Sequence, residues 1–167
     1  MSGKDLSEAH RALRKMLADH PELPRKLRAL WALFSSGGIA EKDLTALLDH
    51  ESEHVRAWAV RLLGDERRIP ASAAEKFASM AAADPSPLVR LFLASALQRM
   101  ELEPRWPIAE KLAQRAEDAD DAAIPLMLWY GVEPLVKSDL ARASKLAGES
   151  KIPFLRQSIA RRIASGN

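Results

Sequence analysis

The sequence contains no cysteine, and only 5% of its 167 residues are aromatic. The absence of cysteine excludes a disulfide framework, a thiolate metal site, a cysteine nucleophile and covalent attachment of a c-type haem by this chain. No apolar run approaches the roughly 20 residues that a membrane-spanning helix needs, and the first residues carry no apolar signal core. The formal net charge is only +2, so the composition predicts neither a membrane span nor a strong overall electric field.

Amphipathic runs rich in alanine and leucine fill most of the chain, which is 47% apolar and 29% charged. In the run 49–65, the residues Val55, Trp58, Ala59 and Leu62 recur at the spacing of one helical face. The same design returns around Val89, which lies 34 positions after Val55. The pattern predicts an all-α protein.

We predict ten helices in five antiparallel pairs. The second helices of the pairs align at Leu27, Val55, Val89, Ile124 and Ile152, in steps of 28, 34, 35 and 28 residues. Each pair alone would leave an apolar face bare, and stacking against its neighbours would bury that face. The expected fold is therefore a right-handed α-solenoid, with the handedness typical of such arrays. It forms a single domain over 1–167, with repeats at about 6–36, 39–64, 70–101, 104–136 and 138–165.

Proline and glycine set the predicted helix ends. Gly64 and Gly148 are expected to end the fourth and ninth helices, and Ser86 followed by proline is expected to begin the sixth. The stretch 104–107 is predicted to be a break between helices, and Pro134 is predicted to bend the eighth helix or end it early.

Two of the second helices open with the same signature. A loop aspartate, Asp49 or Asp84, precedes Val-Arg and a run rich in alanine and leucine. This pattern resembles HEAT repeats, whereas the signatures of tetratricopeptide and ankyrin repeats are absent. Arg56 and Arg90 lie one position past the core stripe, where each can reach a loop carboxylate of its own or of the next repeat. The fourth pair has Leu126 at the arginine position, so looser or more hydrophobic stacking is expected there.

Longer blocks carry a narrower resemblance over about residues 20–163. They are 55–65 with Trp58, 82–87, 93–99, 105–107, 126–136 and 150–153. They resemble the HEAT segment of large bacterial multidomain haem proteins of the planctomycete and verrucomicrobium type, often labelled membrane-bound dehydrogenases. Those proteins place a β-propeller before the segment and a Cys-x-x-Cys-His cytochrome domain after it. This chain has neither, so the resemblance transfers no dehydrogenase residue.

The most site-like cluster is Trp129, Tyr130 and Glu133, which places aromatic rings and a carboxylate on one helix. Packing beside a bend at Pro134 accounts for the same residues, and a ligand or partner contact is the alternative.

The expected second helices together carry more positive charge than the whole chain, and such helices line the concave face of HEAT arrays. An anionic partner is one interpretation, including nucleic acid as in HEAT-like DNA glycosylases. The eighth helix is acidic, however, and aromatic residues do not interleave the arginines. The candidate partner-binding residues are Arg28, Arg61, Arg90, Trp129, Tyr130, Glu133, Arg156, Arg161 and Arg162.

Two histidine–glutamate pairs, at 50–51 and 53–54, resemble those of HEAT-type di-iron hydroxylases. Those enzymes need several such pairs, and the other histidines, His10 and His20, are not followed by glutamate. The acidic turn 118–121 has a spacing that favours a solvated loop over a cation site. We predict no catalytic residue, metal or cofactor.

The sequence thus favours a non-enzymatic scaffold that contacts protein partners or neighbouring domains of a longer chain. The alternatives are a nucleic-acid-binding or DNA-repair module, and a non-catalytic fragment of a larger haem-containing dehydrogenase. Location depends on the same question: exported or periplasmic within such a parent, and otherwise cytoplasmic.

Overall fold

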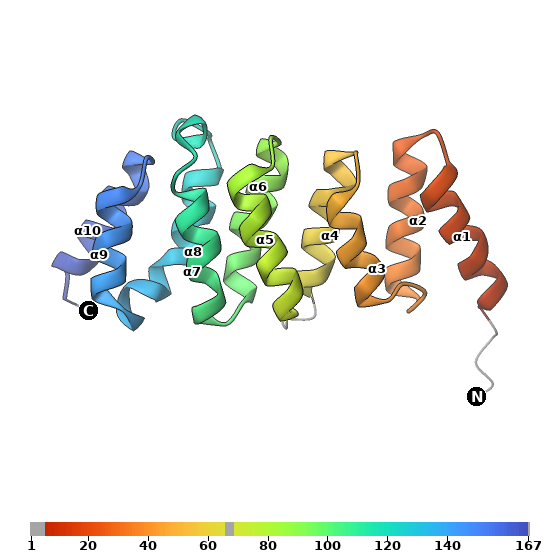
Figure 1. Ribbon diagram of the computed structural model, residues 1–167, viewed down its shortest axis with the longest axis horizontal. Helices are drawn as coiled ribbons and strands as arrows, with labels where there is room; N and C mark the ends of the chain where they lie inside the picture. The colour runs from red at the N-terminus through yellow and green to blue at the C-terminus, as the bar shows by residue number, and fades with distance from the viewer. Residues whose placement is uncertain (1–5, 66–68, 167) are drawn as a thin grey trace. The chain divides into compact units, whose positions relative to one another are not determined.

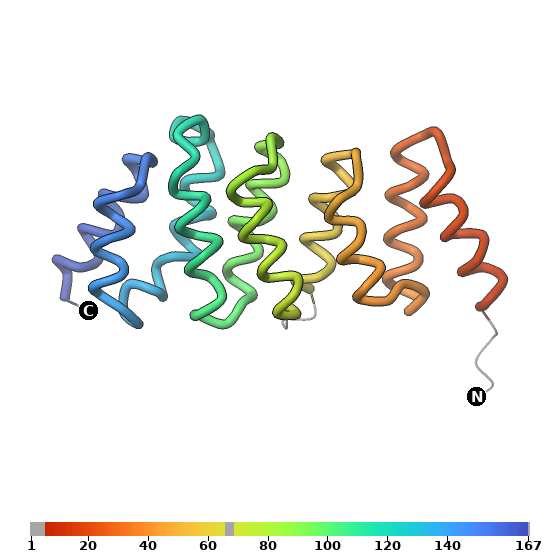
Figure 2. The backbone as a smooth tube through the Cα atoms, viewed as in Figure 1, coloured from red at the N-terminus to blue at the C-terminus, as the bar shows by residue number. Residues whose placement is uncertain are grey.

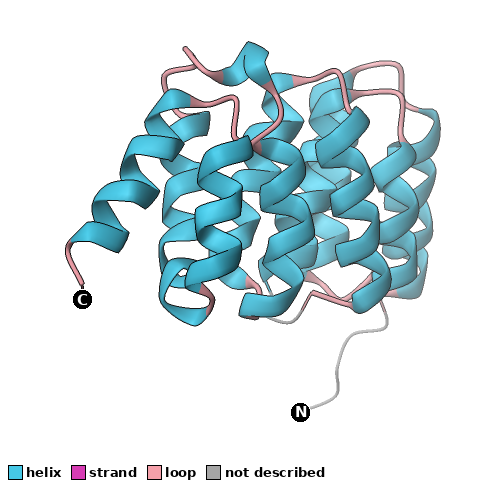
Figure 3. Ribbon diagram, turned by 60° about the vertical axis from the view of Figure 1, so that its left-hand side comes forward, coloured by secondary structure: helices cyan, strands magenta, loops and turns pink. Residues whose placement is uncertain are grey.

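The structure is a computed structural model that describes residues 6–65 and 69–166 (Figure 1). The described residues form helices and loops without a strand, as Figure 3 shows, so the predicted all-α class is confirmed. The α-helices among them are α1 (Ser7–Asp19), α2 (Leu23–Ser35), α3 (Glu41–Ala46), α4 (Glu53–Asp65), α5 (Ala71–Ala83), α6 (Pro87–Ala96), α7 (Leu102–Leu112), α8 (Ile124–Ser138), α9 (Leu140–Glu149) and α10 (Pro153–Ala164). Three short 3-10 helices accompany them, η1 (Leu47–Asp49), η2 (Leu97–Arg99) and η3 (Ala116–Asp118).

The chain divides into two compact units, 1–47 and 48–167, and each is described by itself. In the first unit α1 and α2 pack along each other as a hairpin (Figure 2). Gly37 follows α2 with φ of 71°, the left-handed conformation that glycine adopts without steric cost. The guanidinium of Arg14 donates to the Gly38 carbonyl at 2.7 Å and ties α1 to that turn. Leu30 and Leu33 fill the inward side of α2, while Trp31 beside them is 38% exposed.

In the second unit the even-numbered helices form one row. Successive members pack along one another in the order α4, α6, α8 and α10, and we call this the even row. On the other side α5 packs along α7, while α9 contacts α8 and α10. The alignment positions Val55, Val89, Ile124 and Ile152 are all almost fully buried, as the periodicity predicts. Figure 2 shows the chain alternating between the two layers as helical hairpins.

The predicted break at 104–107 is wrong, because α7 begins at Leu102 and runs through both of its prolines. Pro104 lies in the first turn, where the amide groups have no intrahelical acceptor, so its missing N–H costs nothing. The first turns of α7 also bury Arg105 and Trp106, and that burial holds the helix together through Pro107.

Three other helix ends also differ from prediction. α8 continues past Pro134 to Ser138, so the expected early end is wrong. Gly64 and Gly148 lie inside α4 and α9 instead of ending them, and neither has positive φ. Gly64 is buried beside Arg99, so tertiary packing overrides its local preference, whereas Gly148 has open space around it. The Ser86 cap is confirmed, since its hydroxyl accepts a hydrogen bond from the Val89 amide.

Among the described residues, no helix has both the length and the apolar character needed to cross a membrane.

Candidate functional site

The polar interior of the second unit is built from two repeated arginine–aspartate joints. In the first, the Arg56 guanidinium on α4 donates from Nε and Nη2 to both carboxylate oxygens of Asp84, at 2.8 and 2.9 Å. Its Nη1 donates to the carbonyls of His50 and Glu51 at 2.9 and 3.0 Å. The guanidinium therefore binds both the loop before its own helix, α4, and the loop before the next even helix, α6.

The second joint has the same form one step further along the even row. Arg90 on α6 donates from Nε and Nη2 to the two oxygens of Asp118, both at 2.5 Å, and from Nη1 to the Asp84 carbonyl at 3.1 Å. The side chains of Arg90 and Asp118 are each only 3% exposed. Both joints span 28 residues, so the same bidentate contact recurs between successive helices of the even row.

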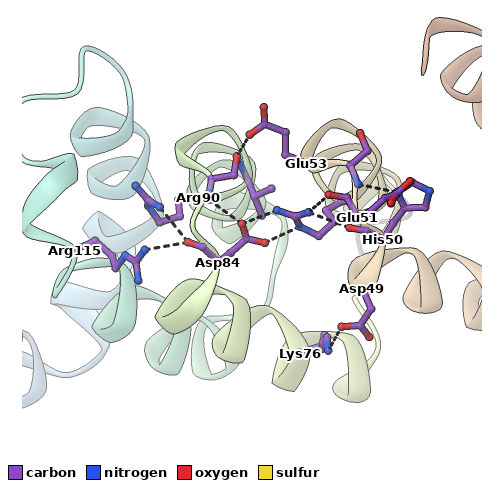
Figure 4. Close-up of polar contacts among 12 residues, drawn as sticks. Asp49, His50, Glu51, Glu53, Lys76, Asp84, Arg90 and Arg115 are labelled. Carbon is purple, nitrogen blue, oxygen red and sulfur yellow. Dashed lines mark hydrogen bonds and ion pairs between the residues drawn. The ribbon is translucent and has the colours of Figure 1, made fainter. Parts of the chain in front are cut away.

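Asp84 belongs to both joints (Figure 4). Its carboxylate binds Arg56, while its carbonyl accepts from Arg90 and, at 3.0 Å, from Arg115. Burial opposes ionisation of Asp84, but the hydrogen bonds from Arg56 and from the Ser86 amide outweigh it. The pKa of this carboxyl therefore lies below its ordinary value. The Ser86 hydroxyl in turn donates to Glu53, which adds a further tie between α4 and the α6 cap.

The predicted ladder is confirmed at both positions, and in each case the carboxylate comes from the next repeat. Asp49 does not join it; its carboxylate binds Lys76 of α5 at 2.5 Å, as Figure 4 shows. The second carboxylate is Asp118, which the sequence does not distinguish from Asp120 or Asp121. Arg90, one of the candidate partner-binding residues, is buried in this joint with its guanidinium on Asp118.

A different joint connects α7 with α8, within the expected fourth pair. Arg105, which is 8% exposed, donates to the Met100 carbonyl from Nε and Nη2 and to the Gly131 carbonyl from Nη1 at 3.1 Å. Its burial lowers the pKa of the guanidinium. Gly131 also allows close approach, since an added Cβ would lie 2.5 Å from the Cβ of Leu97. Helix α8 therefore packs closely on η2, at the step that Arg90 and Asp118 also join.

The remaining candidate residues lie on several helices. Arg28 is exposed on α2 in the first unit. In the second unit Tyr130 is 44% exposed on α8 and Trp129 beside it is half-buried. Glu133 lies 3.7 Å from Arg162 of α10, which brings two predicted residues together across the even row. Arg156 and Arg161 are exposed on α10, and Arg61 pairs with Asp65 within α4 at 3.3 Å.

A groove that sequence reasoning missed lies over α4, α6 and α8. Its volume is about 320 Å³, and its lining is mainly apolar around Leu91 and Phe92, with Arg61 and Arg99 at its edge. The Phe92 ring meets Trp58 edge-on at 6.2 Å between centroids. Phe92 is only half-buried, and hydrophobic periodicity alone does not distinguish such a residue from a fully buried one.

The residues that were considered for a metal site and set aside include some that bind backbone amides. His50 Nδ1 accepts from the Ser52 amide, and Asp121 accepts from the amides of Ala123 and Ile124. Within 6–65 and 69–166, no three histidine or carboxylate side chains gather as a metal site would require.

Comparisons with models of known protein families, with curated proteins and with solved structures found no match to this chain.

Proposed function

We propose that this chain is a non-catalytic helical-repeat scaffold of the HEAT type, an armadillo-like α-solenoid that holds protein partners or neighbouring domains by its shape. The observation that carries the proposal is the repeated arginine–aspartate joint, with Arg56 on Asp84 and Arg90 on Asp118. A repeat whose contact to its neighbour is fixed by a bidentate ion pair presents the next repeat at a defined angle.

The energetics of these joints support a role in geometry. A buried ion pair contributes little net stability, because desolvation of both ions offsets their attraction. Breaking it, however, leaves an uncompensated buried charge. Such a pair penalises alternative packings more than it stabilises the native one, and a fixed packing is what a scaffold needs.

The test of this function is affinity capture with cross-linking from the source cells, using the whole chain as bait. The Arg156→Glu, Arg161→Glu variant changes exposed charges on α10 of the even row. The matched control, Lys111→Glu with Lys145→Glu, changes two exposed charges on α7 and α9. We expect a partner that the α10 variant loses and the control retains.

Two results would contradict the proposal. One is failure of the wild-type chain to capture any partner. The other is reproducible chemical turnover by the purified chain with a metal or cofactor. The dehydrogenase-fragment alternative is tested by the flanking reading frame, which should encode a propeller on one side and a Cys-x-x-Cys-His motif on the other.

A further inference from the structure

The groove over α4, α6 and α8 has an apolar floor and a basic edge. Leu91, Phe92 and Ala96 of α6 and Met127 of α8 supply apolar surface, and Ser95 lies among them. Its volume of about 320 Å³ accommodates one or two large side chains of a partner.

The two arginines at this edge are incompletely neutralised. Arg61 Nε and Arg99 Nη1 lie 3.3 and 3.4 Å from the same oxygen of Asp65. Charge-assisted hydrogen bonds are usually about 2.7–2.9 Å long, so neither guanidinium is held tightly. Their side chains remain 40% and 28% exposed. Among the described residues, Asp65 is the carboxylate that faces both guanidinium groups, which leaves a local excess of positive charge beside the apolar floor.

The contact surface continues along α8. Tyr130 follows Met127 by three residues, so both lie on one helical face, and Tyr130 is 44% exposed. Tyrosine and arginine are the residue types most enriched where interfaces are energetically important.

From this arrangement we propose that the groove binds an acidic peptide segment of a partner protein. A large apolar side chain of the segment fills the groove between α6 and α8, and an aspartate or glutamate within one helical turn binds Arg61 and Arg99. This inference rests on the proposed scaffold function, and it specifies the kind of segment by which a partner would bind the scaffold. Charge complementarity selects this occupant, because a nucleic acid would need a row of cations and offers no apolar side chain to the floor.

The experiment selects linear peptides from a random display library on the immobilised full chain, and measures the soluble winners by fluorescence anisotropy. Ser95→Trp fills the groove, and Arg61→Gln with Arg99→Gln removes its charge while keeping side-chain length. The matched control is Ser144→Trp, at an exposed position on α9. Thermal melting checks that each variant folds. If Ser95→Trp does not fold, binding by the Arg61→Gln, Arg99→Gln variant tests the proposal by itself.

We expect the enriched peptides to combine a large apolar residue with a nearby carboxylate. Their Kd should rise at least about tenfold in each groove variant, and stay unchanged in Ser144→Trp. Peptides without acidic residues, or binding that survives both groove variants, would overturn the groove proposal while leaving a scaffold that binds elsewhere. Self-association abolished by Ser95→Trp would also overturn it, by showing a second copy in the groove. Failure to enrich any peptide, together with failure to capture any partner, would remove both proposals.

Discussion

The most constrained side chains are the buried partners Arg90 and Asp118. Asp118→Ala leaves the guanidinium in an interior site without its carboxylate, and we expect a loss of about 3–5 kcal/mol in the free energy of unfolding, measured by denaturant titration. Glu149→Gln, which removes an exposed ion pair with Lys145, is the control and should change little. Arg90→Leu combined with Asp118→Leu should cost less than the sum of the single changes, and strict additivity would show that the pair is not coupled.

Asp84 makes stability depend on acidity. Its pKa in the folded chain lies below the ordinary 3.8, so folding favours the ionised form. The resulting stabilisation is complete above about pH 5 and is lost as the pH falls through 3.8 toward the folded-state pKa. Measured from pH 6 to 2, the unfolding free energy of wild type should fall more steeply than that of Asp84→Asn. Parallel curves would contradict this assignment.

Sequence reasoning found the arginine side of the joints and only part of the acidic side. Val-Arg at a helix start is a local pattern, so Arg56 and Arg90 stand out. Selecting Asp118 requires knowing that η3 turns the chain back onto α6, which the letters do not show. Arg105 was missed because the prolines around it predict a break, whereas its guanidinium bonds two carbonyls in the interior.

Helix α8 shows how one missing side chain sets the distance between elements. Gly131 faces Leu97, where an added Cβ would lie 2.5 Å away, whereas Gly148 in α9 has open space. We expect Gly131→Ala to destabilise the chain by about 1–3 kcal/mol through overpacking. Gly148→Ala should stabilise it by about 0.4–1 kcal/mol, because alanine restricts the unfolded chain. Chemical denaturation of both variants checks the pair; equal effects would mean that α8 shifts freely on η2.

The helix limits themselves were predicted best where burial and capping agree. Ser86 caps α6 and Asp139 caps α9, and both follow from side-chain chemistry next to the backbone. The prolines at 104 and 107 were expected to break the helix, but Pro104 lies in the first turn of α7. The cost of Pro107 is offset by contacts with other helices, such as the cation–π contact of Arg142 on the Trp106 ring at 4.7 Å. Helix α8 likewise continues through Pro134.

For the molecule as a whole, the periodicity predicted which residues face inward and did not locate the division at residue 47, inside the repeat expected at 39–64. Hydrophobic spacing reports the direction of side chains, whereas the division follows from how densely neighbouring segments contact each other. The apolar groove could not be predicted for a related reason. The type of an apolar residue does not show whether its side chain is half-exposed or fully buried.

The distribution of charge over the whole chain determines how strongly DNA binding would depend on salt. Six arginines acting together on phosphates would give a salt slope of about −5 in log K against log salt. Arg90 is buried, and Arg61 and Arg162 lie beside carboxylates, which leaves three of the six arginines. We therefore expect a slope no greater in magnitude than about 3 in a duplex DNA titration. A steep slope, abolished by Arg156→Glu with Arg161→Glu, would favour the DNA-binding alternative instead.

The double role of Asp84 gives the array a direction and a way to grow. The segment that holds Asp84 and Arg90 receives Arg56 on its own aspartate and sends Arg90 to Asp118. Each arginine lies 28 residues before its aspartate. A tandem copy of residues 56–89 inserted after residue 89 would place a new arginine directly after the valine, with a new aspartate 28 residues ahead of it. Arg90 would still precede Asp118 by 28 residues. Gene duplication within this segment would thus lengthen the chain without leaving a buried charge unpaired. Each new segment would bring its own arginine and its own aspartate.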